Sequence, residues 1–194
     1  MLGRVLRFGA VVLAATGVWQ VGQAAWLDVK ARLAQHLLQR AWARTLAGEP
    51  DARPWPWADT WPVARLRVPA HGVDLVVLDG MSGRTLAFAP GHASGSARPG
   101  AVGTAIVTGH RDTHFRFLER VQPGEEIVVD TPGQPTARFR VREAAVLDAR
   151  TAVIRRDGGA PALVLLTCYP FDAIRPGGPL RYAVVAEPAS ITSD

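Results

Sequence analysis

Cysteine is nearly absent from this chain, because Cys168 is the only one in 194 residues. A single thiol cannot form an internal disulfide, and it cannot build a zinc site on cysteine ligands. The cysteine content therefore leaves the cellular compartment open. It also means that any thiol chemistry of the protein has to use Cys168.

Lysine is equally rare, since Lys30 is the only one and nearly all the positive charge is arginine. The net charge is +5, but the arginines are scattered along the chain and form no long basic run. No interleaving of basic and aromatic residues indicates a nucleic-acid surface. We therefore expect no nucleic-acid partner. With 48% hydrophobic and 20% charged residues, the composition is that of a globular protein.

Charge is missing altogether between Arg7 and Asp28. Residues 8–27 are about 20 residues, roughly 30 Å as a helix, which matches the thickness of a bilayer's hydrocarbon core. We predict a retained, single-pass anchor in the inner (cytoplasmic) membrane, with the rest of the chain in the periplasm. A signal peptide cleaved near Ala25 is the alternative. Basic residues flank both ends, so charge alone does not select an orientation.

The composition changes after this segment. Residues 26–46 keep apolar side chains at helical spacing, which predicts either a stalk helix that continues the anchor or a linker helix that packs on the domain. Residues 53–62 are rich in proline and tryptophan, which indicates an extended linker. The predicted division is a membrane anchor (1–27), a stalk helix and linker (28–60), a β-rich domain (61–188) and a tail (189–194).

Short apolar or alternating segments, separated by glycine and proline clusters, make up most of the β-rich region. This pattern is typical of a small all-β barrel or sandwich. One short helix is expected between residues 113 and 120. The predicted strands are residues 63–68, 73–78, 85–89, 103–108, 126–130, 136–147, 162–167 and 180–186.

Cys168 ends the apolar segment ALVLLTC and is followed at once by Tyr169 and Pro170. A buried strand that stops at a proline places this thiol at the rim of the core. His110 and Arg181 lie at the ends of two other predicted strands. A thiol, an imidazole and a guanidinium are the minimum set for acyl transfer through a thioester. The alternative is an inert cysteine buried in the core.

The histidine and the arginine each have a rival. His114 is the alternative base, and Arg175, in a proline–glycine loop, is the alternative cation. His110 and His114 lack a third ligand at a suitable spacing, so we expect no metal site. The other polar candidates, expected on the surface or in loops, are His36, His71, His92, Arg111 and Asp112.

Four segments together resemble the sortase family, most closely the proteobacterial class GN sortases. His110, Cys168 and Arg181 match the family's catalytic residues, while Val164 stands where the TLxTC signature has its first threonine. The order and spacing of the segments make the match specific. They are residues 89–100 (APGHASGSARPG), 105–113 (AIVTGHRDT), 117–127 (FLERVQPGEEI) and 164–168 (VLLTC).

The resemblance implies a sortase-like, eight-stranded β-barrel with short helices, preceded here by a transmembrane helix. It implies a cysteine transpeptidase in which Cys168 attacks the Thr–Gly bond of an LPxTG-like signal at the C-terminus of a secreted protein. His110 would transfer protons, Arg181 would stabilise the oxyanion, and an amine would accept the acyl group. No metal or organic cofactor is implied. Substrate contacts are expected from Thr167, Tyr169 and Arg175.

Two other functions fit the same residues. The first is a membrane-anchored cysteine hydrolase whose acceptor is water, which a product assay with and without an amine would distinguish. The second is a non-catalytic, anchored β-domain that keeps Cys168 in its core, which the reactivity of the thiol would distinguish.

Overall fold

The computed structural model describes residues 2–154, 160–175 and 177–189. The chain divides into two compact units, Met1–Leu37 and Leu38–Asp194. The predicted domain boundaries after residues 27, 60 and 188 stay a prediction. Residues 190–194 of the predicted tail lie outside the described residues.

One long helix, α1 (Leu2–Leu46), runs through the first unit and ends in the second. The predicted helix over residues 26–46 is confirmed as the last part of α1. Gly48 ends it, with a φ of 92° and a backbone N–H that donates to the Thr45 carbonyl at 3.0 Å. Glycine adopts this left-handed conformation without the steric cost that other residues meet.

Helix α1 also covers the segment that the sequence predicts to cross a membrane. Among the residues whose side chains are described, no helix is both long enough and apolar enough for a span. Gln20 and Gln23 interrupt the apolar stretch, and an amide without a partner is costly in hydrocarbon. The structure therefore confirms the helix and does not support the predicted span.

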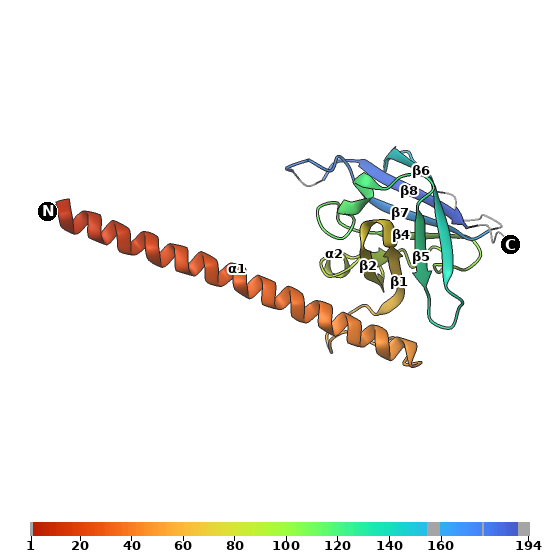
Figure 1. The fold of residues 1–194 in the computed structure, drawn as a ribbon, viewed down its shortest axis with the longest axis horizontal. Helices are drawn as coiled ribbons and strands as arrows, with labels where there is room; N and C mark the ends of the chain where they lie inside the picture. Colours follow the sequence, from red (N-terminus) through yellow and green to blue (C-terminus); the bar gives the residue numbers. More distant parts are fainter. Residues whose placement is uncertain (1, 155–159, 176, 190–194) are drawn as a thin grey trace. The chain divides into compact units, whose positions relative to one another are not determined.

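The second unit contains a closed, eight-stranded β-barrel, which confirms the expected all-β fold class. Figure 1 shows the strands that form the barrel, with short helical turns between some of them. The strand order is β1-β2-β3-β4-β7-β8-β6-β5. The strands are β1 (Pro62–Val68), β2 (Val73–Asp79), β3 (Gly91–His92), β4 (Thr104–Thr108), β5 (Glu126–Asp130), β6 (Ala137–Asp148), β7 (Ala162–Cys168) and β8 (Leu180–Pro188). The short helices are η1 (Pro69–His71), α2 (Gly83–Leu86) and η2 (Arg116–Arg120).

Alternation along the strands builds the barrel's core. In β1, Ala64, Leu66 and Val68 are fully buried, whereas Arg65 and Arg67 between them are not. Successive side chains of a strand point to opposite faces, so one face enters the core and the other meets solvent. Strand β7 has three consecutive buried residues, Leu163 to Leu165, which is why its sequence reads as an unbroken apolar run.

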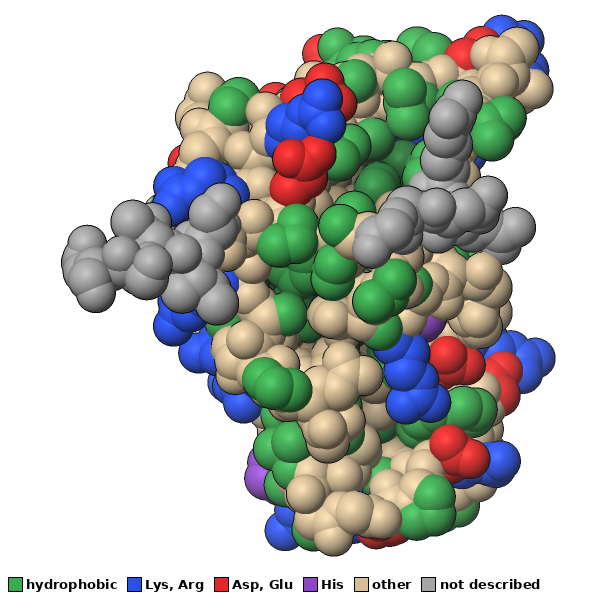
Figure 2. Space-filling model, turned by 90° about the vertical axis from the view of Figure 1, so that its right-hand side faces the viewer, with side chains coloured by type: hydrophobic (Ala, Val, Ile, Leu, Met, Phe, Trp, Pro, Cys, Tyr) green, Lys and Arg blue, Asp and Glu red, His purple; other side chains and the backbone are tan. Residues whose placement is uncertain are grey.

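Charged groups on the outer face of the barrel lie in local pairs. Figure 2 shows blue and red side chains side by side at several places on one face. Four arginines each have a guanidinium nitrogen 2.6 Å from a carboxylate oxygen, so an adjacent negative charge balances each positive charge. The pairs are Arg65–Asp74, Arg67–Asp130, Arg138–Glu126 and Arg142–Glu187.

The prediction of a strand over residues 85–89 was wrong. The Ser82 hydroxyl accepts a hydrogen bond from the Thr85 backbone N–H at 3.1 Å and caps the short helix α2 instead. The strand in this region is β3, only two residues long. A Cβ on Gly91 would lie 2.1 Å from the Gly80 carbonyl oxygen, so glycine is what allows β3 to approach this closely.

The last turns of α1 pack on the barrel within the second unit. Leu38 is fully buried and Trp42 is 4% exposed. They form a small apolar cluster with Val76 and Leu78 of β2 and with Ala89. This cluster covers the outer face of β2 and continues the core beyond the barrel.

Candidate active site

Cys168 is the last residue of β7 and lies directly opposite Arg181 of β8 in an antiparallel pair. The pairing continues past the cysteine, because the Tyr169 backbone N–H donates to the Leu180 carbonyl at 3.1 Å. The side chain of Cys168 is partly exposed and forms no disulfide. A partly exposed thiol at a strand end favours a reactive cysteine over an inert core residue.

His110 follows β4, which runs parallel to β7 with Thr108 opposite Leu166. Two further bonds extend this alignment beyond the strand. The Gly109 backbone N–H donates to the Leu166 carbonyl at 3.2 Å, and the buried Thr167 hydroxyl donates to the Gly109 carbonyl at 2.7 Å. We infer from this register that His110, two residues past Thr108, lies level with Cys168, two residues past Leu166. Its side chain is exposed.

The turn that carries His110 is fixed by a close contact between Gly109 and a buried ring. A Cβ on Gly109 would lie 2.8 Å from Cγ of Phe115, which is fully buried. The Phe115 backbone N–H donates to the His110 carbonyl at 3.0 Å and closes the turn. Glycine thus lets the aromatic ring pack under the histidine.

The guanidinium of Arg181 is held against the loop between β7 and β8. Its Nη1 donates to the carbonyls of Gly178 and Leu180, each at 2.8 Å. The side chain is half-buried. Because β8 places Arg181 opposite Cys168, the cation lies at the same edge of the barrel as the thiol.

The other residues predicted to contact substrate have different surroundings. Thr167 is 3% exposed, and its hydroxyl donates a hydrogen bond to the Gly109 carbonyl. The Arg175 side chain is exposed in the β7–β8 loop. Tyr169 stacks on Tyr182 with ring centroids 6.1 Å apart, and Phe171 meets Tyr182 edge-on at 5.2 Å. These three rings form an aromatic cluster beside Cys168, of which the sequence analysis named only Tyr169.

Arg111 was expected to be a polar loop residue, and it does lie in a turn, but its burial was not foreseen. Its side chain is only 8% exposed. Its Nη2 donates to the carbonyls of Ala173 at 2.8 Å and Arg175 at 3.3 Å. The residue next to His110 is therefore bonded to the loop that follows Cys168. Its position directly after the candidate histidine was the only signal in the sequence.

The remaining histidines differ in burial. Burial lowers the pKa of the His114 imidazole, and the charge of the nearby His110 lowers it further, against smaller opposing effects of the Phe88 backbone and Asp112. His92, expected on the surface or in a loop, lies instead in β3 and is 4% exposed, with Nε2 2.8 Å from the Ala97 carbonyl oxygen. In the part of the chain that the structure describes, no three histidine, cysteine or acidic side chains form a metal-binding group.

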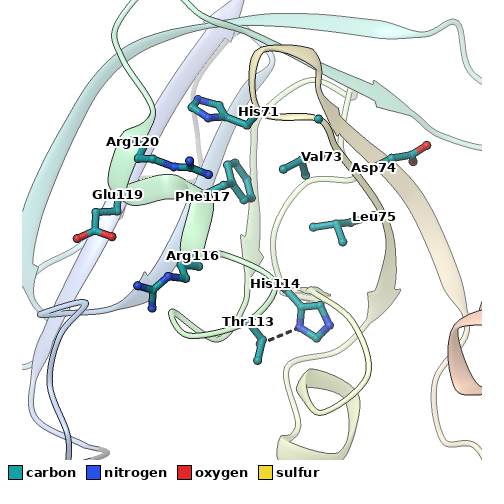
Figure 3. Close-up of a pocket in the computed structure, with 11 residues that line it drawn as sticks. His71, Val73, Asp74, Leu75, Thr113, His114, Arg116, Phe117, Glu119 and Arg120 are labelled. Carbon is teal, nitrogen blue, oxygen red and sulfur yellow. Dashed lines mark hydrogen bonds between the residues drawn. The ribbon is translucent and has the colours of Figure 1, made fainter. Parts of the chain in front are cut away.

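A cavity of about 700 Å³ lies between β2 and the segment that follows His110. Figure 3 shows Val73, Leu75 and Phe117 between His71 at one end and His114 at the other. None of the predicted site residues lines it, because they lie at the ends of β4, β7 and β8. His114 is thus the only candidate base that faces this cavity.

The known sortase domain matches residues 66–189 of this chain. The match covers more than half of the sequence, from the middle of β1 to the end of β8, and includes all three candidate catalytic residues. The chain belongs to the sortase family. The resemblance on which the sequence analysis relied is therefore confirmed at the level of the family.

This sortase is 27% identical to Sortase D of Bacillus subtilis (strain 168) over 121 residues, which are 61% of this chain and 60% of the relative. The chain thus spans about three-fifths of the length of the curated relative. It also matches the solved structure of a Clostridium perfringens Sortase D5 transpeptidase, with 25% identity and a TM-score of 0.58, over 66% of this chain and 79% of that one.

Two further solved sortases share the barrel. Sortase C-1 from Actinomyces oris is 27% identical with a TM-score of 0.58, over 67% of this chain and 75% of that one. Sortase A from Corynebacterium diphtheriae is 22% identical with a TM-score of 0.61, over 81% and 85%, and supports the fold alone. The sortase-like barrel is confirmed. None of these relatives tests the resemblance to class GN, which stays a prediction.

Proposed function

We propose that this sortase is a cysteine transpeptidase that works through a thioester on Cys168. The observation that carries the proposal is the meeting of three strand ends, of β4, β7 and β8, at one edge of the barrel. This edge brings together a partly exposed thiol, an exposed imidazole and a guanidinium. Membership of the sortase family supports the same chemistry.

In the proposed reaction the Cys168 thiolate attacks the carbonyl carbon of the Thr–Gly bond in an LPxTG-like signal. The C–N bond breaks, and the leaving glycine amine takes a proton from the His110 imidazolium. The threonine acyl group remains on Sγ as a thioester. An incoming amine then gives its proton to the neutral His110 and attacks the thioester, which forms a new amide and releases the thiolate.

Arg181 stabilises the negative charge that develops on the carbonyl oxygen in both attacks. Its hydrogen bonds to the Gly178 and Leu180 carbonyls use Nη1, so Nε and Nη2 are the nitrogens that we assign to the oxyanion. Tyr169 and Arg175 contact the signal peptide from the strand end and the loop. Thr167 acts instead through Gly109, since its buried hydroxyl holds the histidine turn against β7.

The proposed substrate is a secreted protein with a C-terminal sorting signal, and the proposed acceptor is an amine of unassigned identity. We further propose that residues 8–27 of α1 hold the enzyme in the inner membrane with the barrel in the periplasm, because this stretch carries no charge. Membrane fractions washed with alkaline carbonate should retain the full chain and release residues 28–194. Release of the full chain as well would overturn the anchor without touching the chemistry.

The decisive experiment is mass spectrometry of the protein after incubation with an LPxTG peptide. The wild-type protein should gain the mass of the acyl fragment, and Cys168→Ala should not. His110→Ala should lower kcat/KM by at least about 10²–10⁴-fold, because it removes both proton transfers. The matched control is His114→Ala, which should retain most activity.

The same assay separates transpeptidase from hydrolase. Added hydroxylamine or a glycine peptide should convert the acyl fragment into the amine adduct at the expense of the free acid. If the free acid forms at an unchanged rate and no adduct appears, the enzyme is a hydrolase. If Cys168→Ala cleaves the peptide, or His114→Ala is inactive while His110→Ala works, the assigned roles are wrong.

A further inference from the structure

The proposed chemistry does not use the buried arginine next to the histidine. Arg111 follows His110 directly, and its Nη2 donates to the carbonyls of Ala173 and Arg175. Both carbonyls lie in the β7–β8 loop, between Cys168 and Arg181. The Arg111 side chain thus connects the segment that carries His110 with the loop between Cys168 and Arg181.

This arrangement is a poor way to stabilise a fold. Arg111 is only 8% exposed, and its Nη1 is buried without a hydrogen-bond partner among the described residues. The salt bridges found in the described part of the chain do not include Arg111 either. A buried cation with incomplete partners costs free energy, and an apolar side chain of similar volume is often at least as stable. A role in positioning the β7–β8 loop therefore explains the presence of Arg111 better than a contribution to stability does.

We propose that Arg111 is a positioning residue that fixes residues 169–175, the first part of the β7–β8 loop, as a wall of the sorting-signal site. This inference rests on the proposed function. Residues 169–175 follow Cys168 directly, and the carbonyls of Gly178 and Leu180 further along the chain hold Arg181. When residues 169–175 are held in one place they keep the peptide against the thiol, while the pairing of β7 with β8 keeps Cys168 opposite Arg181.

The geometry of the tether predicts which substitutions preserve it. A single nitrogen, Nη2, serves both carbonyls. A lysine ammonium is also a single nitrogen with three donors, so it can replace this bond pattern even though it cannot replace a planar fork. Arg111→Lys should therefore keep the loop in place, whereas Arg111→Met should fill the space and lose the tether.

The test compares these two variants in the full chain with Arg116→Met, an exposed arginine on the same segment. Hydrogen exchange of the amides of residues 169–175 reports on the loop without any substrate. In Arg111→Met this exchange should be about tenfold faster, and KM for an LPxTG peptide should rise about tenfold with kcat within about threefold. Its melting temperature should stay equal or rise. Arg111→Lys should keep the amide exchange rate and KM close to those of the wild type. Arg116→Met should change neither quantity.

Several results would overturn the inference. Unchanged exchange in Arg111→Met would mean that Arg111 does not hold the loop. Unfolding of Arg111→Met would make it a structural residue, and a loss confined to kcat would place it at the reacting atoms. A wild-type protein that forms no acyl-enzyme would overturn the proposed function instead, while the exchange comparison would still decide whether the tether exists.

Discussion

At the scale of single residues, Arg181 and Arg175 differ in the contacts that fix their side chains. Arg181 is fixed on β8 by two carbonyls, whereas the Arg175 side chain is exposed in the loop. We expect Arg181→Ala to lower kcat/KM for an LPxTG peptide by about 10²–10³-fold, because it removes oxyanion stabilisation. Arg181→Lys should rescue poorly, since an ammonium lacks the planar fork. Arg175→Ala should keep most activity, and the reverse ranking would exchange their roles.

The half-buried His114 next to the site predicts a pH dependence of stability. Burial, and then the charge of His110, hold the pKa of His114 below its usual value. An unfolded histidine binds its proton near pH 6.5, but the folded protein resists that proton. This contribution to stability is therefore complete above pH 6.5 and is lost as the pH falls toward the lower pKa of the folded state.

The corresponding test is chemical denaturation at pH 7 and pH 5. The loss of unfolding free energy between the two should be smaller in His114→Gln than in the wild-type protein. His36→Gln, at an exposed position of α1, should follow the wild type. Equal losses in all three proteins would show that His114 does not resist protonation in the folded state.

At the scale of elements, the turn after β4 depends on the absence of one side chain. In Gly109→Ala the new methyl group would press on the fully buried Phe115 ring. We expect a loss of about 1–3 kcal/mol in unfolding free energy, as for other overpacked sites, together with reduced peptide turnover because His110 moves with the turn. Gly83→Ala in α2 meets no atom within 4 Å and should leave both quantities unchanged. Equal effects of the two substitutions would contradict this packing argument.

Most strands could be predicted because their own residues specify them. Strand β1 alternates, β7 is continuously apolar, and β5 (Glu126–Asp130) matches its predicted bounds. Strand β3 could not be predicted, since two residues carry no periodicity and its pairing depends on the close approach to Gly80. The helix α2 was missed because its decisive feature is a single serine cap.

The candidate site was partly predictable for a similar reason. Cys168 ends a recognisable strand, and the sortase motifs named His110 and Arg181. The role of Arg111 could not be read from the sequence, because its partners are backbone carbonyls about 60 positions away and any residue type can supply them. The aromatic partners of Tyr169 could not be predicted, because the sequence does not show the register of β7 and β8. That register brings Tyr182 opposite Thr167 and next to Tyr169.

At the scale of the whole molecule, the long helix is divided between two units. Residues up to Leu37 form the first, while Leu38 and Trp42 belong to the apolar cluster on β2. The compact unit that contains the barrel therefore begins inside α1, before the linker predicted at residues 53–62. A cut at the end of the helix would uncover Val76, Leu78 and Ala89, and a cut before Leu38 would not.

Two fragments test where the barrel's folding unit begins. Residues 38–194 should fold, keep the wild-type denaturation midpoint and turn over an LPxTG peptide, because they retain both buried side chains. Residues 47–194 should lose about 3–5 kcal/mol in unfolding free energy, the usual cost of removing a large buried side chain. Trp42→Ala in the longer fragment should reproduce a large part of that loss, since Trp42 is the largest member of the cluster. If both fragments are equally stable, the last turns of α1 contribute nothing to the barrel and the boundary lies after Leu46.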